Sequence, residues 1–271
     1  PVFLRDTTDR NRTSPFAFTG NKFEFRMLGS SNSIACANIM LNAAVADVLS
    51  EFADTLESAK DFDKAVHTLL KDTIIAHKRI IFNGNGYDDS WIKEAEKRGL
   101  SNLRTTPDAL ARLLDKKNVD MLTRHKVFTE AELNSRYEIT LENYVKTVNI
   151  EALTMIDMAK KQIIPAVIEY TNILADTVIK VKNAGCDAAV TKNMLSLVTE
   201  KLAIMQKALS TLEAVEEKAC SMKRGKEQAF VYRNEVVTAM NNLREPSDEL
   251  EMLVGKEYWP FPTYADLIFE V

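Results

Sequence analysis

The sequence predicts a mainly α protein, in which a short strand region precedes a helical bundle with a long antiparallel helical hairpin. Only 8 Gly and 7 Pro occur among the 271 residues, whereas 46% of the residues are hydrophobic. Few turn formers and many core formers favour long helices over a many-stranded barrel or sandwich. The third observation is a helical spacing of apolar residues that persists through the last third of the chain. The length leaves room for one large domain or two modest ones.

Charge and hydropathy exclude two classes of partner. The chain carries 35 Lys and Arg against 39 Asp and Glu, a formal net charge of −4, so we expect no general binding to nucleic acid through phosphates. Its longest apolar runs fall well short of the roughly 20 residues that span a bilayer, so we expect no membrane association.

The three cysteines, Cys36, Cys186 and Cys220, lie far apart in the sequence. This spacing indicates neither a disulfide framework nor a zinc site. No basic segment followed by an apolar one opens the sequence, so we expect a reducing, cytoplasmic location.

The first 31 residues differ from the rest, because they are polar, rich in arginine and strand-like. The sequence begins with Pro1 rather than Met, which leaves open a processed product or the C-terminal piece of a longer protein; we favour the second. Residues 22–26 alternate charged and aromatic side chains with period two. This alternation predicts a strand with Phe23 and Phe25 in a core and the charged side chains on the other face.

The middle of the chain predicts a series of helices separated by clear turn signals. Asn83–Gly86 is the strongest turn signal. The expected helices are a buried, Ala-rich one at about 33–58, one at about 61–81, a short one at about 89–98 closed by Gly99, one with Thr106 as N-cap and Pro107 as its first helical residue, and one starting at the capping box Thr129–Glu132.

The last third predicts three consecutive amphipathic helices that form an antiparallel bundle. The first runs from about 147 to 182, with Pro165 bending it and Gly185 ending it. The return helix repeats apolar residues with the three–four alternation of a coiled-coil seam. The third runs to about Leu243, and the aromatic tail at 258–264 is expected to be extended and docked on a surface.

Familiar catalytic motifs are incomplete. Gly84 and Gly86 begin a GxGxxG pattern, but Asp89 stands at its last glycine position and no strand–turn–helix context supports it. Three histidines are spread along the sequence, and we interpret them as surface or core residues: His67, His77 and His125.

The most informative chemistry lies near the start of the chain. Arg10 and Arg12 precede a strand that presents Lys22, Glu24 and Arg26 on one face. Arginines suit phosphate or carboxylate oxygens, and a glutamate suits Mg²⁺. The pattern therefore indicates a site for a polyanion with a metal, while an exposed edge strand with mixed charges remains the plainer alternative.

The same segment resembles the closing part of the glutamine synthetase catalytic domain, in the form of the type III branch. In the shorter enzymes an Asn–Arg pair leads into a strand of the form basic-x-Glu-x-Arg, then a turn and a buried helix. These elements read here as Asn11–Arg12, then Lys22–Arg26, then the turn through Ser33 and the Ala-rich helix. Later segments resemble the same branch: FNGNGYDDSWIKEAEKRGLSNLRTTPDAL, FTEAELNSRYEI and YWPFPTYADLIFEV.

The resemblance implies roles for four residues. Glu24 would ligate the metal that bridges the ATP phosphates, and Arg26 would hold the carboxylate of glutamate. Arg12 would stabilise the transferring phosphoryl group, and Lys22 would lie near the nucleotide. Ala17 stands where the shorter enzymes have a further arginine, so that role is absent or filled elsewhere. Lys22 replaces the usual arginine, which keeps the charge but loses bidentate geometry.

The resemblance also implies the activity and assembly of the parent protein. It predicts a cytoplasmic, ATP- and Mg²⁺- (or Mn²⁺-) dependent glutamate–ammonia ligase in stacked rings, a dodecamer, with the present chain inactive alone. We expect the end of the catalytic domain at 1–60, a helical connection at 61–146, the bundle at 147–245 and the tail at 246–271. The alternative from another class is a non-catalytic helical scaffold or oligomerisation module.

Overall fold

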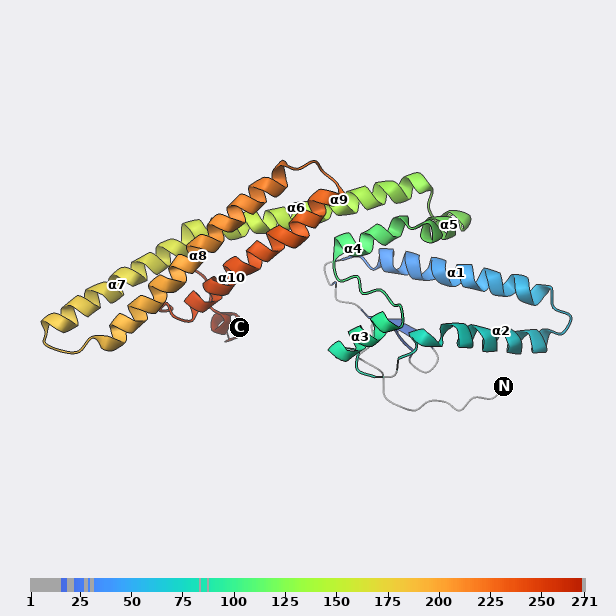
Figure 1. Ribbon diagram of the computed structural model, residues 1–271, viewed down its shortest axis with the longest axis horizontal. Helices are drawn as coiled ribbons and strands as arrows, with labels where there is room; N and C mark the ends of the chain where they lie inside the picture. Colours follow the sequence, from blue (N-terminus) through green and yellow to red (C-terminus); the bar gives the residue numbers. More distant parts are fainter. Residues whose placement is uncertain are drawn as a thin grey trace. The chain divides into compact units, whose positions relative to one another are not determined.

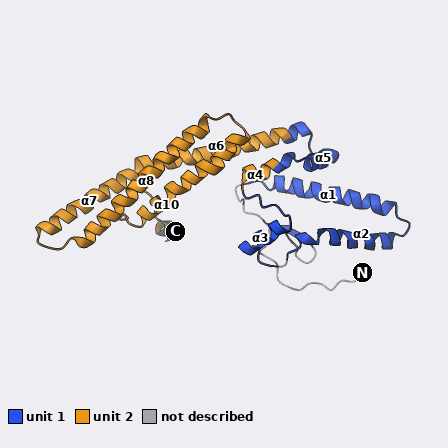
Figure 2. Ribbon diagram, in the orientation of Figure 1, with its two compact units in different colours: residues 1–104, 112–133 blue, residues 105–111, 134–271 orange. Residues whose placement is uncertain are grey.

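A computed structural model describes residues 16–18, 22–26, 29, 32–82, 84–86 and 88–269, and helices dominate the described part (Figure 1). The chain divides into two compact units (Figure 2). Unit 1 comprises residues 1–104 and 112–133, and unit 2 comprises residues 105–111 and 134–271. The mainly α fold with a long helical hairpin is confirmed.

Unit 1 contains a two-stranded antiparallel ribbon. Strand β1 (Phe16–Phe18) pairs with β2 (Phe23–Phe25), so that the Cα atoms of Ala17 and Glu24 are partners. The predicted strand is confirmed, but the prediction that its aromatic face lies in a core is wrong. Phe23 is 62% exposed and Phe25 38% exposed. A two-stranded ribbon needs another layer to bury its apolar face fully, and both phenylalanines remain substantially exposed.

The helices of unit 1 follow the sequence signals closely. They are α1 (Ala35–Glu57), α2 (Phe62–His77), the 3₁₀ turn η1 (Lys78–Ile80), α3 (Asp89–Lys97) and α5 (Lys116–Arg124). Asp61 caps α2 by accepting a hydrogen bond of 3.1 Å from the Lys64 amide. Gly99 ends α3 with a φ of 75°, a left-handed conformation that glycine adopts without the cost of a Cβ atom.

Helix α1 is far more exposed than its composition predicts. Ala43 is its only buried residue among those described, so the prediction of a well-buried helix is wrong for this chain. Ala43 forms a small core with Leu122 and Leu133, because α1 packs against α5 on one side. By length and composition α1 could also cross a membrane.

Unit 2 is built from one very long helical segment and its return. Its elements are α4 (Thr106–Leu110), α6 (Glu130–Met158, which begins in unit 1), the π turn η3 (Ala159–Ile163), α7 (Ile164–Asn183), α8 (Ala189–Ser221), α9 (Lys226–Val231), the π turn η4 (Tyr232–Val236), α10 (Val237–Glu251) and α11 (Tyr264–Phe269). Thr105, not Thr106, is the N-cap of α4, so Pro107 is its second residue rather than its first.

The first long helix begins earlier than predicted. The Thr129–Glu132 capping box forms as expected, with the Glu132 amide donating to Thr129 Oγ1 at 3.2 Å. From Glu130 the segment then continues without a break through α6, η3 and α7 to Asn183, so the predicted start near 147 is wrong. Pro165 lies just after the π turn, in which the Ile164 amide bonds to the Ala159 carbonyl. A proline ring clashes with the carbonyl four residues earlier, and a widened turn accommodates it.

The bundle packs α8 against α7 on one side and α10 on the other. Among the described residues, twenty buried side chains form its core, including Leu212 and Tyr232. The third helix runs on to Glu251 rather than ending near Leu243, and it includes Pro246. The aromatic tail docks on this core as predicted through Tyr258, Trp259 and Phe261, and it then forms α11, which the sequence did not indicate.

Candidate functional site

Strand β2 brings three charged side chains together on one face. Arg26 Nη2 lies 2.6 Å from Glu24 Oε2, and Arg26 Nε donates to the same oxygen at 3.2 Å. Lys22 Nζ lies 3.3 Å from the other carboxylate oxygen, Glu24 Oε1. Residues two apart on a strand share a face, so the extended backbone alone brings the two cations to the carboxylate.

The three side chains differ in how far they are exposed. The Glu24 side chain is 19% exposed and that of Arg26 29%, whereas that of Lys22 is 61% exposed. The carboxylate is therefore partly shielded and its charge is balanced locally, while the lysine reaches solvent. Such a cluster can hold an anionic group through its cations and can offer hard carboxylate oxygens to a divalent ion.

One carboxylate does not make a metal centre. Among the described residues, no group of three or more His, Cys, Asp or Glu side chains could hold a metal ion. Glu24 fits Mg²⁺ or Mn²⁺ by the nature of its oxygens, but the number of ligands in the described part does not. Arg12, the residue predicted to stabilise a phosphoryl group, lies outside the described residues, as does Arg10.

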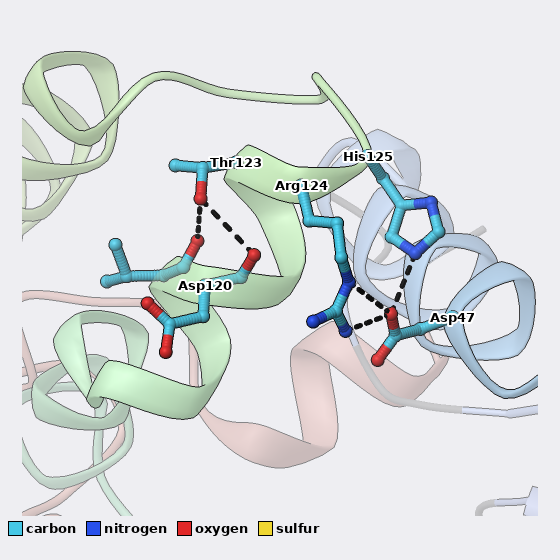
Figure 3. Close-up of polar contacts among 6 residues, drawn as sticks. Asp47, Asp120, Thr123, Arg124 and His125 are labelled. Atoms are coloured by element: carbon cyan, nitrogen blue, oxygen red, sulfur yellow. Dashed lines mark hydrogen bonds and ion pairs between the residues drawn. The ribbon is translucent and has the colours of Figure 1, made fainter. Parts of the chain in front are cut away.

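A second polar cluster in unit 1 was not predicted. The Asp47 carboxylate on α1 is contacted by Arg124 and His125 at the end of α5, with Arg124 Nε at 3.2 Å and His125 Nε2 at 2.7 Å from Oδ1 (Figure 3). The hydrogen bond from Arg124, and then that from His125, holds the pKa of Asp47 below its usual value. These side chains are 77 and 78 residues from Asp47 in sequence, so no local pattern could reveal the pairing. Its position between two helices indicates a structural role, in keeping with the interpretation of His125.

Comparison with known proteins shows similarity to glutamine synthetases. The profile of the glutamine synthetase C-terminal domain matches residues 65–182. A glutamine synthetase of Butyrivibrio fibrisolvens is 39% identical over 277 residues, covering 100% of this chain. A glutamine synthetase of Bacteroides fragilis is 36% identical and a type-3 glutamine synthetase of Dictyostelium discoideum 34% identical, each over 99% of this chain. The chain is thus similar over its whole length to glutamine synthetases, and it carries a match to their C-terminal domain.

The similarity to these glutamine synthetases includes the β2 strand as well as the bundle. Because the alignments cover 99–100% of this chain, the segment that carries Lys22, Glu24 and Arg26 lies within them. The resemblance to the type III branch is confirmed by the named type-3 relative. The chain spans only 38–39% of the length of these relatives. In these relatives, further residues of a site built around β2 can therefore come from the part of the sequence that this chain does not span.

Proposed function

We propose that this chain forms part of a glutamate–ammonia ligase, which uses ATP to join ammonia to the side chain of glutamate. One observation carries the proposal: a partly shielded glutamate is flanked by a lysine and an arginine on one strand face, in a chain similar over its whole length to glutamine synthetases. Within the described residues, the cluster on β2 contains one carboxylate, that of Glu24. We therefore expect this chain alone to be inactive.

Each site residue receives a proposed role, which for Lys22, Glu24 and Arg26 fits the described geometry. Arg26 holds the carboxylate of glutamate through its guanidinium fork, and Lys22, the most exposed of the three, reaches the nucleotide. Glu24 contributes one oxygen ligand to a Mg²⁺ or Mn²⁺ ion whose other ligands belong to the rest of the parent protein. Arg12 neutralises charge on the transferring phosphoryl group.

The proposed reaction has two steps. The side-chain carboxylate of glutamate attacks the γ-phosphorus of ATP, an O–P bond forms, and ADP leaves. Ammonia then attacks the acyl carbon of the γ-glutamyl phosphate, a C–N bond forms, the C–O bond breaks, and phosphate leaves while the nitrogen loses a proton. Phosphoryl transfer depends mainly on positioning and charge neutralisation, which the cations beside Glu24 can provide.

Further features of the proposal rest on the resemblance. They are the four segments 1–60, 61–146, 147–245 and 246–271, assembly of the parent protein into stacked rings as a homododecamer, and a cytoplasmic location without membrane or nucleic-acid partners.

A chimaera tests the proposed activity. This chain replaces the aligned region of the Butyrivibrio fibrisolvens protein, and ATP- and metal-dependent formation of glutamine is measured. Glu24→Gln is expected to lower turnover at least about 100-fold, because the amide keeps the size of the side chain but loses the charge. The matched control is Glu57→Gln at the end of α1, which is expected to leave turnover unchanged.

Two results would contradict the proposal. A folded chimaera that forms no glutamine would contradict the proposed ligase function. Full turnover in Glu24→Gln would remove the site assignment and would favour the scaffold alternative.

A further inference from the structure

Unit 2 contains a cavity of about 280 Å³ between the end of α6, η3, α10 and the C-terminal tail. Part of its lining is fully buried, because Ala159, Ile163 and Leu243 are only 1%, 8% and 1% exposed. An apolar cavity of about 150 Å³ is large enough to bind benzene. This cavity therefore has room for an aromatic ring with a short side chain.

Aromatic and sulfur-containing side chains form much of the remaining lining. Trp259 and Phe261 come from the tail, and Met155 and Met158 come from α6. Aromatic rings attract one another in offset or edge-to-face pairs, and methionine sulfur makes favourable contacts with aromatic rings. The lining therefore favours an aromatic ligand over an aliphatic one.

The wall formed by the tail is held by a capping box and an ion pair. The Thr263 amide and hydroxyl both donate to Asp266 Oδ2, at 2.9 Å and 2.8 Å. Lys256 pairs with the other oxygen of the same carboxylate, Asp266 Oδ1. These contacts close the chain on either side of Trp259 and Phe261. Because the wall is already held in place, binding a ligand does not require the tail to be ordered, which favours affinity.

The helical wall contains the π turn η3. Ala159 and Ile163 are the first and last residues of this turn, and both line the cavity. Since the side chain of Ala159 is a single methyl group, the turn borders the cavity without filling it. π turns inside α-helices are frequent at functional sites. The helix geometry therefore points to a ligand independently of the apolar lining.

The charged and hydroxyl side chains of the lining all come from α10. They are Arg244, Ser247, Asp248 and Glu251, and they define the mouth of the cavity. The Arg244 and Asp248 side chains are 62% and 48% exposed, and Arg244 Nε donates to Asp248 Oδ2 at 3.2 Å. Two carboxylates and one guanidinium give the mouth a formal charge of −1. This excess of negative charge favours a cationic group over an anionic one.

We propose that this cavity binds a small aromatic amine, with the ring inside the cavity and the protonated amino group at the mouth, beside Asp248 and Glu251. Carboxylates accept hydrogen bonds from an ammonium group, and such charge-assisted bonds are stronger than neutral ones. The site lies entirely within unit 2, so the inference does not depend on the cluster on β2 or on the proposed ligase function.

Fluorescence of Trp259 tests the binding directly, because Trp259 lines the cavity. The chain has two tryptophans, so Trp91→Phe in the whole chain leaves Trp259 as the reporter. This variant is titrated at low ionic strength with 2-phenylethylamine, with the neutral 2-phenylethanol and with the anionic 3-phenylpropanoate. For the amine we expect a Kd below about 1 mM, as befits a ligand of this size. The acid should bind at least about tenfold more weakly than the amine, with the alcohol between them.

Substitutions on α10 separate the charge of the mouth from its shape. Asp248→Asn combined with Glu251→Gln should abolish the preference for the amine over the acid, because both carboxylates become neutral. The matched control is Glu245→Gln, on the same helix but outside the lining, which should leave the preference unchanged. Ser247→Leu should obstruct the mouth and weaken binding of the amine at least about tenfold, whereas Ser247→Ala should change it by no more than about twofold.

Three results would overturn the proposal. The first is the absence of a saturable change in Trp259 fluorescence with 2-phenylethylamine. The second is a preference for the amine that is missing in the parent or that persists when Asp248 and Glu251 are both neutral. The third is binding that a folded Ser247→Leu variant leaves unchanged, which would place the amine outside the cavity. Circular dichroism checks that each variant is folded, and if Ser247→Leu does not fold, the first two results decide.

Discussion

The two units contain similar amphipathic helices but bury them to very different extents. Among the described residues, the core of unit 2 has twenty buried side chains, whereas that of unit 1 has three. In unit 2 the apolar stripe of α8 meets those of α7 and α10, so α8 and these two helices cover one another. In unit 1 the stripes of α1 and α2 remain largely exposed. The difference shows that amphipathicity specifies which face needs a cover but does not supply the cover.

The two tryptophans allow this comparison to be measured. Trp91 lies on α3 in unit 1, stacked on Phe82 with ring centroids 3.8 Å apart, and Trp259 packs on the core of unit 2. The chain has no third tryptophan. A Trp259→Phe variant therefore reports unit 1 by fluorescence, and a Trp91→Phe variant reports unit 2.

The largest expected effect is on the core of unit 2. Leu212 is fully buried, so Leu212→Ala should lower the free energy of unfolding by about 2–5 kcal/mol. Leu70→Ala on α2, where Leu70 is 50% exposed, should change it by no more than about 0.5 kcal/mol. Urea titrations with the two fluorescence reporters measure both values. Equal losses for the two variants would break the comparison.

Alkaline pH should act on unit 2 chiefly through the buried phenol of Tyr232. The Tyr232 hydroxyl donates to Asn149 Oδ1 at 3.1 Å, and burial raises the pKa of Tyr232 to about 12. The unfolded chain loses this proton near the ordinary value of 10.0, so stability should fall as pH rises from about 10 towards 12. Burial also raises the pKa values of Tyr144 and Tyr258, so ultraviolet titration of tyrosinate should show several late groups, of which the one near 12 is absent in Tyr232→Phe. Ionisation of all tyrosines near pH 10 would contradict the burial of this phenol.

The two units can also be compared at one helix end each, where a glycine adopts a left-handed conformation. Gly99 in unit 1 and Gly185 in unit 2 end helices with φ values of 75° and 77°. Alanine at either position should cost about 1 kcal/mol, because a Cβ atom disfavours the left-handed conformation. Gly185→Asn should cost less, since asparagine tolerates that conformation better. Thermal unfolding measures all three variants, and an unchanged midpoint for Gly185→Ala would contradict the assigned cap.

The smallest effect is expected at the contact between α1 and α5. Asp47 has a pKa below its ordinary value of 3.8, chiefly because Arg124 donates to it. The ionised Asp47 carboxylate thus stabilises the folded protein above about pH 4. This stabilisation is lost as the pH falls through the lower pKa that Asp47 has in the folded protein. Asp47→Asn should remove this acid-dependent part of the unit 1 transition, whereas Asp54→Asn, on an exposed position of the same helix, should retain it. Identical acid profiles for the wild type and Asp47→Asn would show that the ion pair does not hold α1.

Local signals predicted the elements well because their causes are local. The Thr129–Glu132 capping box, the Gly99 and Gly185 helix ends and the alternation in β2 depend on residues a few positions apart. The grouping of Lys22, Glu24 and Arg26 follows from the same alternation, so the described part of the candidate site could be predicted from the strand alone. Helix lengths were less predictable: the first long helix begins at Glu130 rather than near 147, and the third runs to Glu251 rather than ending near Leu243.

Burial and long-range pairing were decided by the tertiary structure. The composition of α1 indicates a core helix, yet only contact with α5 determines which of its faces is covered. The Asp47–Arg124–His125 cluster joins residues more than seventy positions apart. The sequence by itself determined the helices, the charged face of β2 and the family resemblance, since these depend on neighbouring residues. The tertiary structure decided which apolar faces meet, because burial depends on what lies opposite each face.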